Sequence, residues 1–114
     1  MTDHHTLIHE LGTLLDAHKR AEDRLPVARL EHALTSGYAH ALALEAERWR
    51  LEQRLGEAAK QLGSDHVGPD EVAALAERIS SAESDLTRLR GLLAALRERV
   101  RAARAAAFAT GSSA

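Results

Sequence analysis

The sequence predicts an all-α fold: a long antiparallel two-helix coiled-coil hairpin with a shorter N-terminal helix, completed by self-association. Alanine, leucine, arginine and glutamate dominate the 114 residues and aromatic residues make up 3%, which is typical of long helices with narrow apolar seams. Apolar residues also recur at steps of three and four over two long stretches, which is the heptad pattern of packed helices. We therefore expect one helical domain over residues 1–110.

The first helix is expected over residues 3–23. Its apolar stripe contains Leu7, Leu11, Leu14, His18, Ala21 and Leu25. Proline disfavours helix at the residue before it, and the heptad phase slips just before Pro26, so the chain should break there. The sequence leaves open whether this helix folds back on the hairpin or docks on another chain.

The second helix is expected over residues 26–62 and the third over residues 69–108. The seam of the second contains Val27, Leu30, Leu34, Gly37, Ala41, Leu44, Arg48, Leu51, Leu55, Ala58 and Leu62. The seam of the third contains Val72, Leu75, Ile79, Ala82, Leu86, Leu89, Leu93, Leu96, Val100, Ala103 and Ala107. Residues 63–68 are expected to form a tip loop, which is too short for anything but a reversal of the chain. Residues 109–114 are expected to form a disordered tail.

An antiparallel register that sets Gly37 against Leu93 and Arg48 against Ala82 places large side chains opposite small ones. The same register pairs opposite charges along both flanks, which is how coiled coils select orientation. The expected pairs are Glu45 with Arg90, Glu31 with Arg104, Arg54 with Glu71, and Glu47 with Arg78.

Residues 88–104 carry six arginines, and basic helices can bind phosphate backbones. Arg90, Arg97 and Arg104 recur on the flank that faces glutamates, so the remaining candidates for a basic surface are Arg88, Arg99 and Arg101. No aromatic residue or lysine cluster accompanies them. We therefore expect a structural role for this stretch and no nucleic-acid partner.

Six histidines lie in the first forty residues, and His5 and His9 are one helical turn apart, a spacing that can chelate a transition metal. Further ligands are not evident, because the chain has no cysteine and no HExxH motif. We expect no metal and no cofactor, with His5 and His9 as the candidates if a metal binds.

The formal charge of −2 gives no general attraction to nucleic acid or membrane. No signal peptide or membrane span is visible, so a cytoplasmic location is expected. Neither a Ser-His-Asp set, nor a phosphate loop, nor paired catalytic carboxylates can be assembled, which argues against an enzyme.

A second stripe on the second helix, Tyr38, Leu42 and Trp49, lies away from the seam and needs covering. With His18 and Arg48 it forms the set of candidate partner-interface residues. The sequence favours a non-enzymatic protein–protein interaction module, an adaptor or regulator that dimerises or binds another helical protein.

The alternative is a ligand- or metal-responsive regulator that uses the first helix or Arg48, or a factor associated with nucleic acid or RNA polymerase. The tip carries Asp65, Asp70 and Glu71. In shape alone, such an acidic tip resembles that of the Gre-type transcript-cleavage factors, which implies tip carboxylates that reach a polymerase active site. Helix capping accounts for the same residues.

Overall fold

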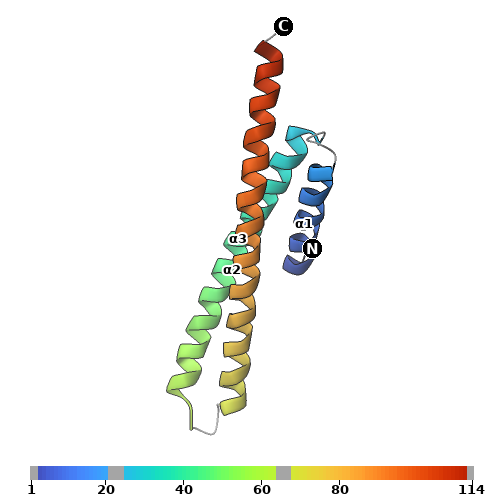
Figure 1. The fold of residues 1–114 in the computed structure, drawn as a ribbon. Helices are drawn as coiled ribbons and strands as arrows, with labels where there is room; N and C mark the ends of the chain where they lie inside the picture. The colour runs from blue at the N-terminus through green and yellow to red at the C-terminus, as the bar shows by residue number, and fades with distance from the viewer. Residues whose placement is uncertain (1–2, 21–24, 64–67, 113–114) are drawn as a thin grey trace.

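The computed structural model describes residues 3–20, 25–63 and 68–112 of the chain. These residues form three α-helices: α1 (His4–Arg20), α2 (Val27–Lys60) and α3 (Pro69–Ser112). The molecule is a rod of 74 × 22 × 21 Å. α2 and α3 run antiparallel along its length, and α1 lies beside the half that is far from the tip (Figure 1). The predicted all-α hairpin with a shorter N-terminal helix is confirmed.

The starts of the two long helices follow from local chemistry. Pro26 precedes α2 in an extended conformation, with φ −60° and ψ 139°, and its carbonyl accepts hydrogen bonds from the amides of Arg29 and Leu30. α3 begins at Pro69, whose missing N–H would have no helical partner in any case. Asp70 and Glu71 then place negative charge at the positive end of the helix dipole.

Two helix ends differ from the predicted ones. α2 ends at Lys60, two residues early, and the chain turns through Gly63 at φ +93°, a conformation that glycine adopts without strain. α3 continues to Ser112, so the tail predicted to be disordered from residue 109 is helical up to that point. Six of the eight residues in 102–109 are alanine, the strongest helix former, which explains the longer helix. Residues 21–23 of the first predicted helix lie outside the described residues.

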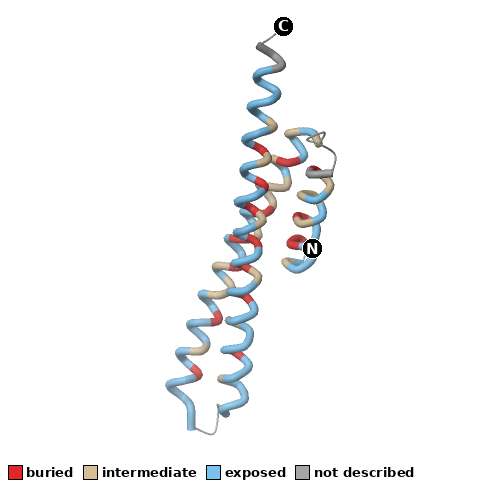
Figure 2. The backbone as a smooth tube through the Cα atoms, viewed as in Figure 1, coloured by how far each residue is buried: buried red, intermediate tan, exposed pale blue. Residues whose placement is uncertain are grey.

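The buried side chains form two clusters along the rod (Figure 2). The larger cluster joins all three helices and contains Leu7, Ile8, Leu11, Leu30, Ala41, Leu44, Leu86, Leu89, Leu93, Leu96 and Val100. The smaller cluster, nearer the tip, joins only α2 and α3 through Leu51, Ala58 and Leu75. The rod therefore has a three-helix half and a two-helix half. Arg48 occupies the seam position of α2 between the two clusters.

The outer ends of the predicted seams are exposed. Leu62 lies beyond the last residue of α2, and Ala107 lies where α3 projects past the start of α2 (Figure 1). Within residues 3–20, 25–63 and 68–112, no helix faces either of these two positions. These two positions correct the predicted seams.

α1 folds back onto the hairpin, antiparallel to α2 and parallel to α3 (Figure 1). Leu7, Leu11 and also Ile8, which the predicted stripe omitted, are buried against the hairpin. The three helices meet at Gly37, where an added Cβ would overlap Cδ2 of Leu93 and lie 3.4 Å from Cδ1 of Leu11. The predicted opposition of Gly37 and Leu93 is therefore confirmed.

Candidate functional site

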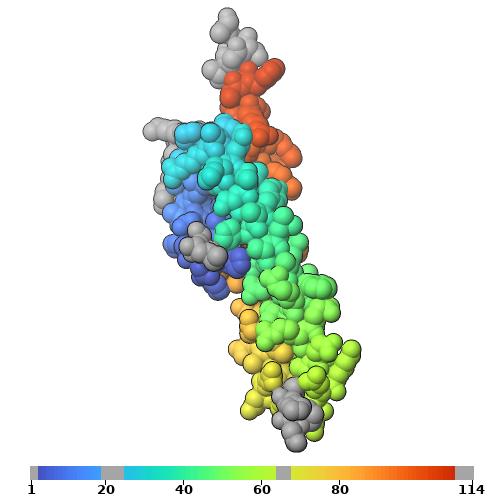
Figure 3. Space-filling view, turned by 180° about the vertical axis from the view of Figure 1, so that it is seen from behind, coloured from blue at the N-terminus to red at the C-terminus, as the bar shows by residue number. Residues whose placement is uncertain are grey.

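Three large apolar side chains on α2 are exposed on the surface of the molecule. Tyr38, Leu42 and Trp49 are 42%, 67% and 61% exposed. Their spacing of four and seven residues keeps them on one face of the helix. α1 docks on a different face, because the α2 residues that pack in the three-helix cluster are Leu30, Ala41 and Leu44. From behind, α2 faces the viewer with α1 beside its first half (Figure 3).

A groove of about 510 Å³ lies next to this stripe, between α2 and α3. Its lining is Tyr38, Ala41, Leu42 and Glu45 from α2 and Arg90, Leu93, Ala94 and Arg97 from α3. No residue of α1 lines it, so the groove opens on the side of the hairpin that α1 leaves bare. We call the surface formed by Tyr38, Leu42, Trp49, Ala94 and Arg97 the groove face.

The charges at the margin of the groove are largely paired. Arg90 donates from its terminal guanidinium nitrogen to Oε1 of Glu45 at 2.5 Å, and Arg104 donates from Nε to Oε1 of Glu31 at 3.1 Å. Both contacts confirm the predicted cross-hairpin register. Arg97, in contrast, makes no ion pair with any residue that the structure describes. It therefore presents an uncompensated positive charge beside an apolar groove.

The other two predicted flank pairs are not formed as direct ion pairs between described residues. Arg54 and Glu71 line a shallow hollow near the tip, and Glu47 and Arg78 line another. Glu47 instead lies 3.9 Å from Nε2 of His4. The docked α1 brings His4 to Glu47, and the register of the hairpin alone does not predict where α1 docks.

Arg48 and His18, two predicted interface candidates, lie elsewhere than the groove face. The side chain of Arg48 is about one-third exposed and its Nε lies 3.7 Å from Oε1 of Glu52 on the same helix. His18 is 0% exposed, because it lies on the face of α1 that packs against the hairpin. His18 is thus a packing residue of this fold and not part of an exposed surface.

The three candidate basic residues do not converge. Arg88 is exposed, Arg99 is partly buried, and Arg101 pairs with Glu98 one turn earlier on α3 at 3.2 Å. Among the described tip residues, Asp70 and Glu71 are exposed in the first turn of α3. Asp65 lies outside the described residues.

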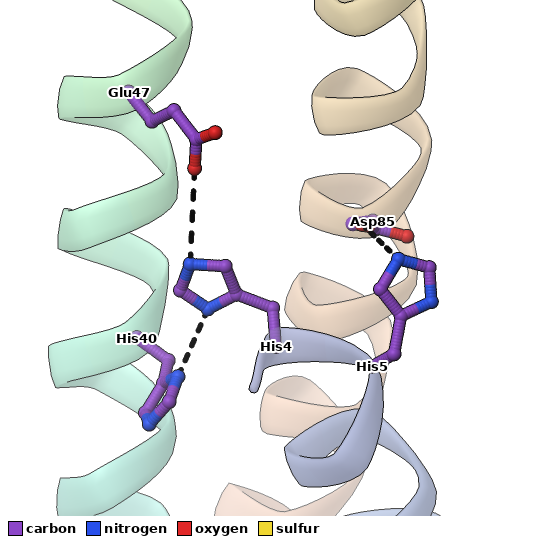
Figure 4. Close-up of polar contacts among 5 residues, drawn as sticks. All are labelled: His4, His5, His40, Glu47 and Asp85. Carbon is purple, nitrogen blue, oxygen red and sulfur yellow. Dashed lines mark hydrogen bonds and ion pairs between the residues drawn. The ribbon is translucent and has the colours of Figure 1, made fainter. Parts of the chain in front are cut away.

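The N-terminus of α1 brings histidines from α1 and α2 together (Figure 4). Nδ1 of His4 lies 2.9 Å from Nδ1 of His40, and the two rings meet edge to face. Nε2 of His5 lies 3.0 Å from a carboxylate oxygen of Asp85 on α3. These contacts tie the start of α1 to both helices of the hairpin. No pattern in the sequence indicates the His4–His40 contact, because the sequence leaves open whether the first helix docks on this hairpin.

The predicted metal candidates do not share a site. His5 faces Asp85, whereas His9 is exposed and lines a separate groove between α1 and α2. Among the residues that the structure describes, no three metal-ligating side chains are grouped closely enough to hold an ion. The described part also contains no helix long and apolar enough to cross a membrane.

Comparison with known proteins adds no further constraint: no family model, no curated protein and no solved structure matches the chain. The fold and the groove face are therefore the features from which a function can be argued. They define a helical hairpin with a docked third helix and one bare apolar face.

Proposed function

We propose that the chain is a non-enzymatic interaction module that binds a helical protein, or a second copy of itself, through the groove face. The observation that supports this most directly is the exposure of Tyr38, Leu42 and Trp49 on one side of α2, next to an apolar groove. Contiguous exposed apolar surface of this kind marks interaction sites in folded proteins. Tyrosine, tryptophan and arginine are also the residues that most often dominate interface energies.

The shape of the surface favours a helix as the bound element. The groove lies between the antiparallel helices α2 and α3, and a third helix is already docked on another side of the same pair (Figure 1). An amphipathic helix laid along the groove would complete a bundle and cover the stripe. Burial of the exposed two-thirds of Leu42 alone would contribute about 1–2 kcal/mol to binding before the entropic cost of association.

Affinity purification of the tagged full chain from its native cells, with mass spectrometry and light scattering, tests this role. The wild-type chain should retain a stoichiometric partner or self-associate, and Leu42→Glu should abolish that association while the circular dichroism spectrum stays helical. Leu62→Glu is the matched control, because Leu62 is also an exposed leucine but lies beyond the end of α2. A chain that stays monomeric without a partner, or a Leu42→Glu variant that associates like the wild type, would contradict the proposal.

A further inference from the structure

We infer that the occupant of the groove face is a second copy of this chain, bound in an antiparallel two-fold arrangement in which Trp49 of each protomer enters the groove of the other. The inference rests on the proposed interaction role and names its partner. The groove face carries both a protruding side chain and a hollow, and these lie at different levels of the same helix. A surface of that kind can complement itself.

The geometry follows from helix dimensions. Trp49 is seven residues beyond Leu42, so it lies about 10 Å further along α2 than the centre of the groove, at 1.5 Å per residue. A two-fold axis that passes between the two α2 helices at the level of Glu45 and Ala46, midway between Leu42 and Trp49, exchanges these two levels. It places each Trp49 at the level of Leu42 of the other protomer, which lines the groove, and a two-fold interface requires this kind of self-complementarity.

Residues near the axis permit a close approach of the two α2 helices. Ala46 is exposed and small, so it offers no bulk to hold the helices apart. Glu45 of each protomer comes close to its symmetry mate, but its carboxylate already accepts a hydrogen bond from Arg90. Two compensated carboxylates repel each other less than two free ones.

Arg97, which makes no ion pair with a described residue of its own chain, has a carboxylate partner in the proposed dimer. Arg97 is seven residues after Arg90, and Tyr38 is seven residues before Glu45, so the observed Glu45–Arg90 pair sets Arg97 level with Tyr38. The two-fold axis brings the partner's residues near Trp49 to that level, and Glu52, one turn after Trp49, lies on the same side of α2 as Glu45. Glu52 is 47% exposed and has only a 3.7 Å contact with Arg48 on its own helix.

Each protomer therefore carries both halves of an intermolecular ion pair, Arg97 and Glu52, and a dimer would contain two such pairs. The tryptophan ring that enters the groove also lies beside Arg97, where a guanidinium stacks favourably on an aromatic face. An unrelated helix would have to supply the bulky residue and the carboxylate at this spacing. A second copy supplies both.

Sedimentation equilibrium of the full chain over a range of concentrations is the first measurement. The wild type should form dimers, and Trp49→Ala should weaken the dimer at least tenfold, whereas the control Leu62→Ala should not. A wild-type chain that is monomeric throughout would overturn the inference. The proposed function is then tested separately by the affinity purification: it holds if the wild type retains another protein that Leu42→Glu loses, and fails if it does not.

A charge exchange tests the register. Arg97→Glu and Glu52→Arg should each weaken self-association at least tenfold, because each homodimer then contains two like-charged pairs. Mixing the two variants should restore assembly, because the mixed dimer contains two opposite-charged pairs. Arg88→Glu, a reversal of an exposed arginine away from the groove, should associate like the wild type. If Trp49→Ala dissociates the dimer but the mixed variants stay apart, the two-fold arrangement is wrong.

Discussion

Leu93 of α3 lies against Gly37 of α2 so closely that a Cβ at residue 37 would overlap its Cδ2 atom. Cδ1 of Leu11 on α1 lies 3.4 Å from the same point. The missing side chain thus lets three helices meet in the larger cluster. A glycine is costly in a helix interior, and here close packing offsets that cost.

Gly37→Ala should lower the free energy of unfolding by about 1 kcal/mol, because the strain of overpacking, about 1–3 kcal/mol, exceeds the helix-propensity gain of about 1 kcal/mol. Urea denaturation measures the difference. Gly56→Ala and Gly91→Ala are matched controls, since both glycines are helical and an added Cβ would meet nothing within 4 Å. Both should stabilise the chain by about 0.5–1 kcal/mol. Equal effects at all three positions would show that residue 37 is not tightly packed.

The cross-hairpin ion pairs predict a rescue by charge exchange. Replacing Arg90 and Arg104 with glutamate should lower the free energy of unfolding by about 1–2 kcal/mol at low ionic strength, because two exposed ion pairs become repulsive contacts. Adding Glu31→Arg and Glu45→Arg should recover most of that loss. In about 1 M salt the double and fourfold variants should converge, since exposed charges are screened. Urea denaturation at both salt concentrations checks this, and a fourfold variant no more stable than the double variant would refute the register.

Docking of α1 depends on its buried leucines. Leu11 is almost fully buried, so Leu11→Ala should cost about 2–5 kcal/mol and loosen α1 before the hairpin. Hydrogen exchange should then be faster in α1 than in the wild type, while amides of α2 and α3 near the tip keep their protection. Thr13→Ala, an exposed position on the same helix, is the control. Unchanged exchange in α1 of the Leu11 variant would show that other contacts hold this helix.

Periodicity predicts a helix seam because a regular backbone fixes which side chains share a face, and the short tip fixes the register of Glu45 with Arg90. This is why the hairpin and two of its four expected ion pairs, Glu45 with Arg90 and Glu31 with Arg104, could be predicted from the residues alone. The placement of α1 could not, because its stripe fits either the same hairpin or another chain. The contact of His4 with His40 and the burial of His18 both follow from that placement.

The sequence predicts only the α2 part of the groove face. The stripe of Tyr38, Leu42 and Trp49 follows from spacing on α2. The roles of Ala94 and Arg97 depend on how two helices sit side by side, although the register that pairs Arg90 with Glu45 also sets Arg97 level with Tyr38. That alignment is the signal that could have revealed the groove.

Arg48 interrupts the apolar seam and separates two parts of the rod that bury different amounts of apolar surface. The tip unit buries Leu51, Ala58 and Leu75, while the other unit buries a cluster from all three helices. Regions with few buried apolar contacts open locally at a lower free energy than the global unfolding transition. We therefore expect the two-helix half around Leu51, Ala58 and Leu75 to open and close while the three-helix half stays folded. Proteases should then cut first in the parts of α2 and α3 that form the two-helix half, and leave the shape of the groove intact.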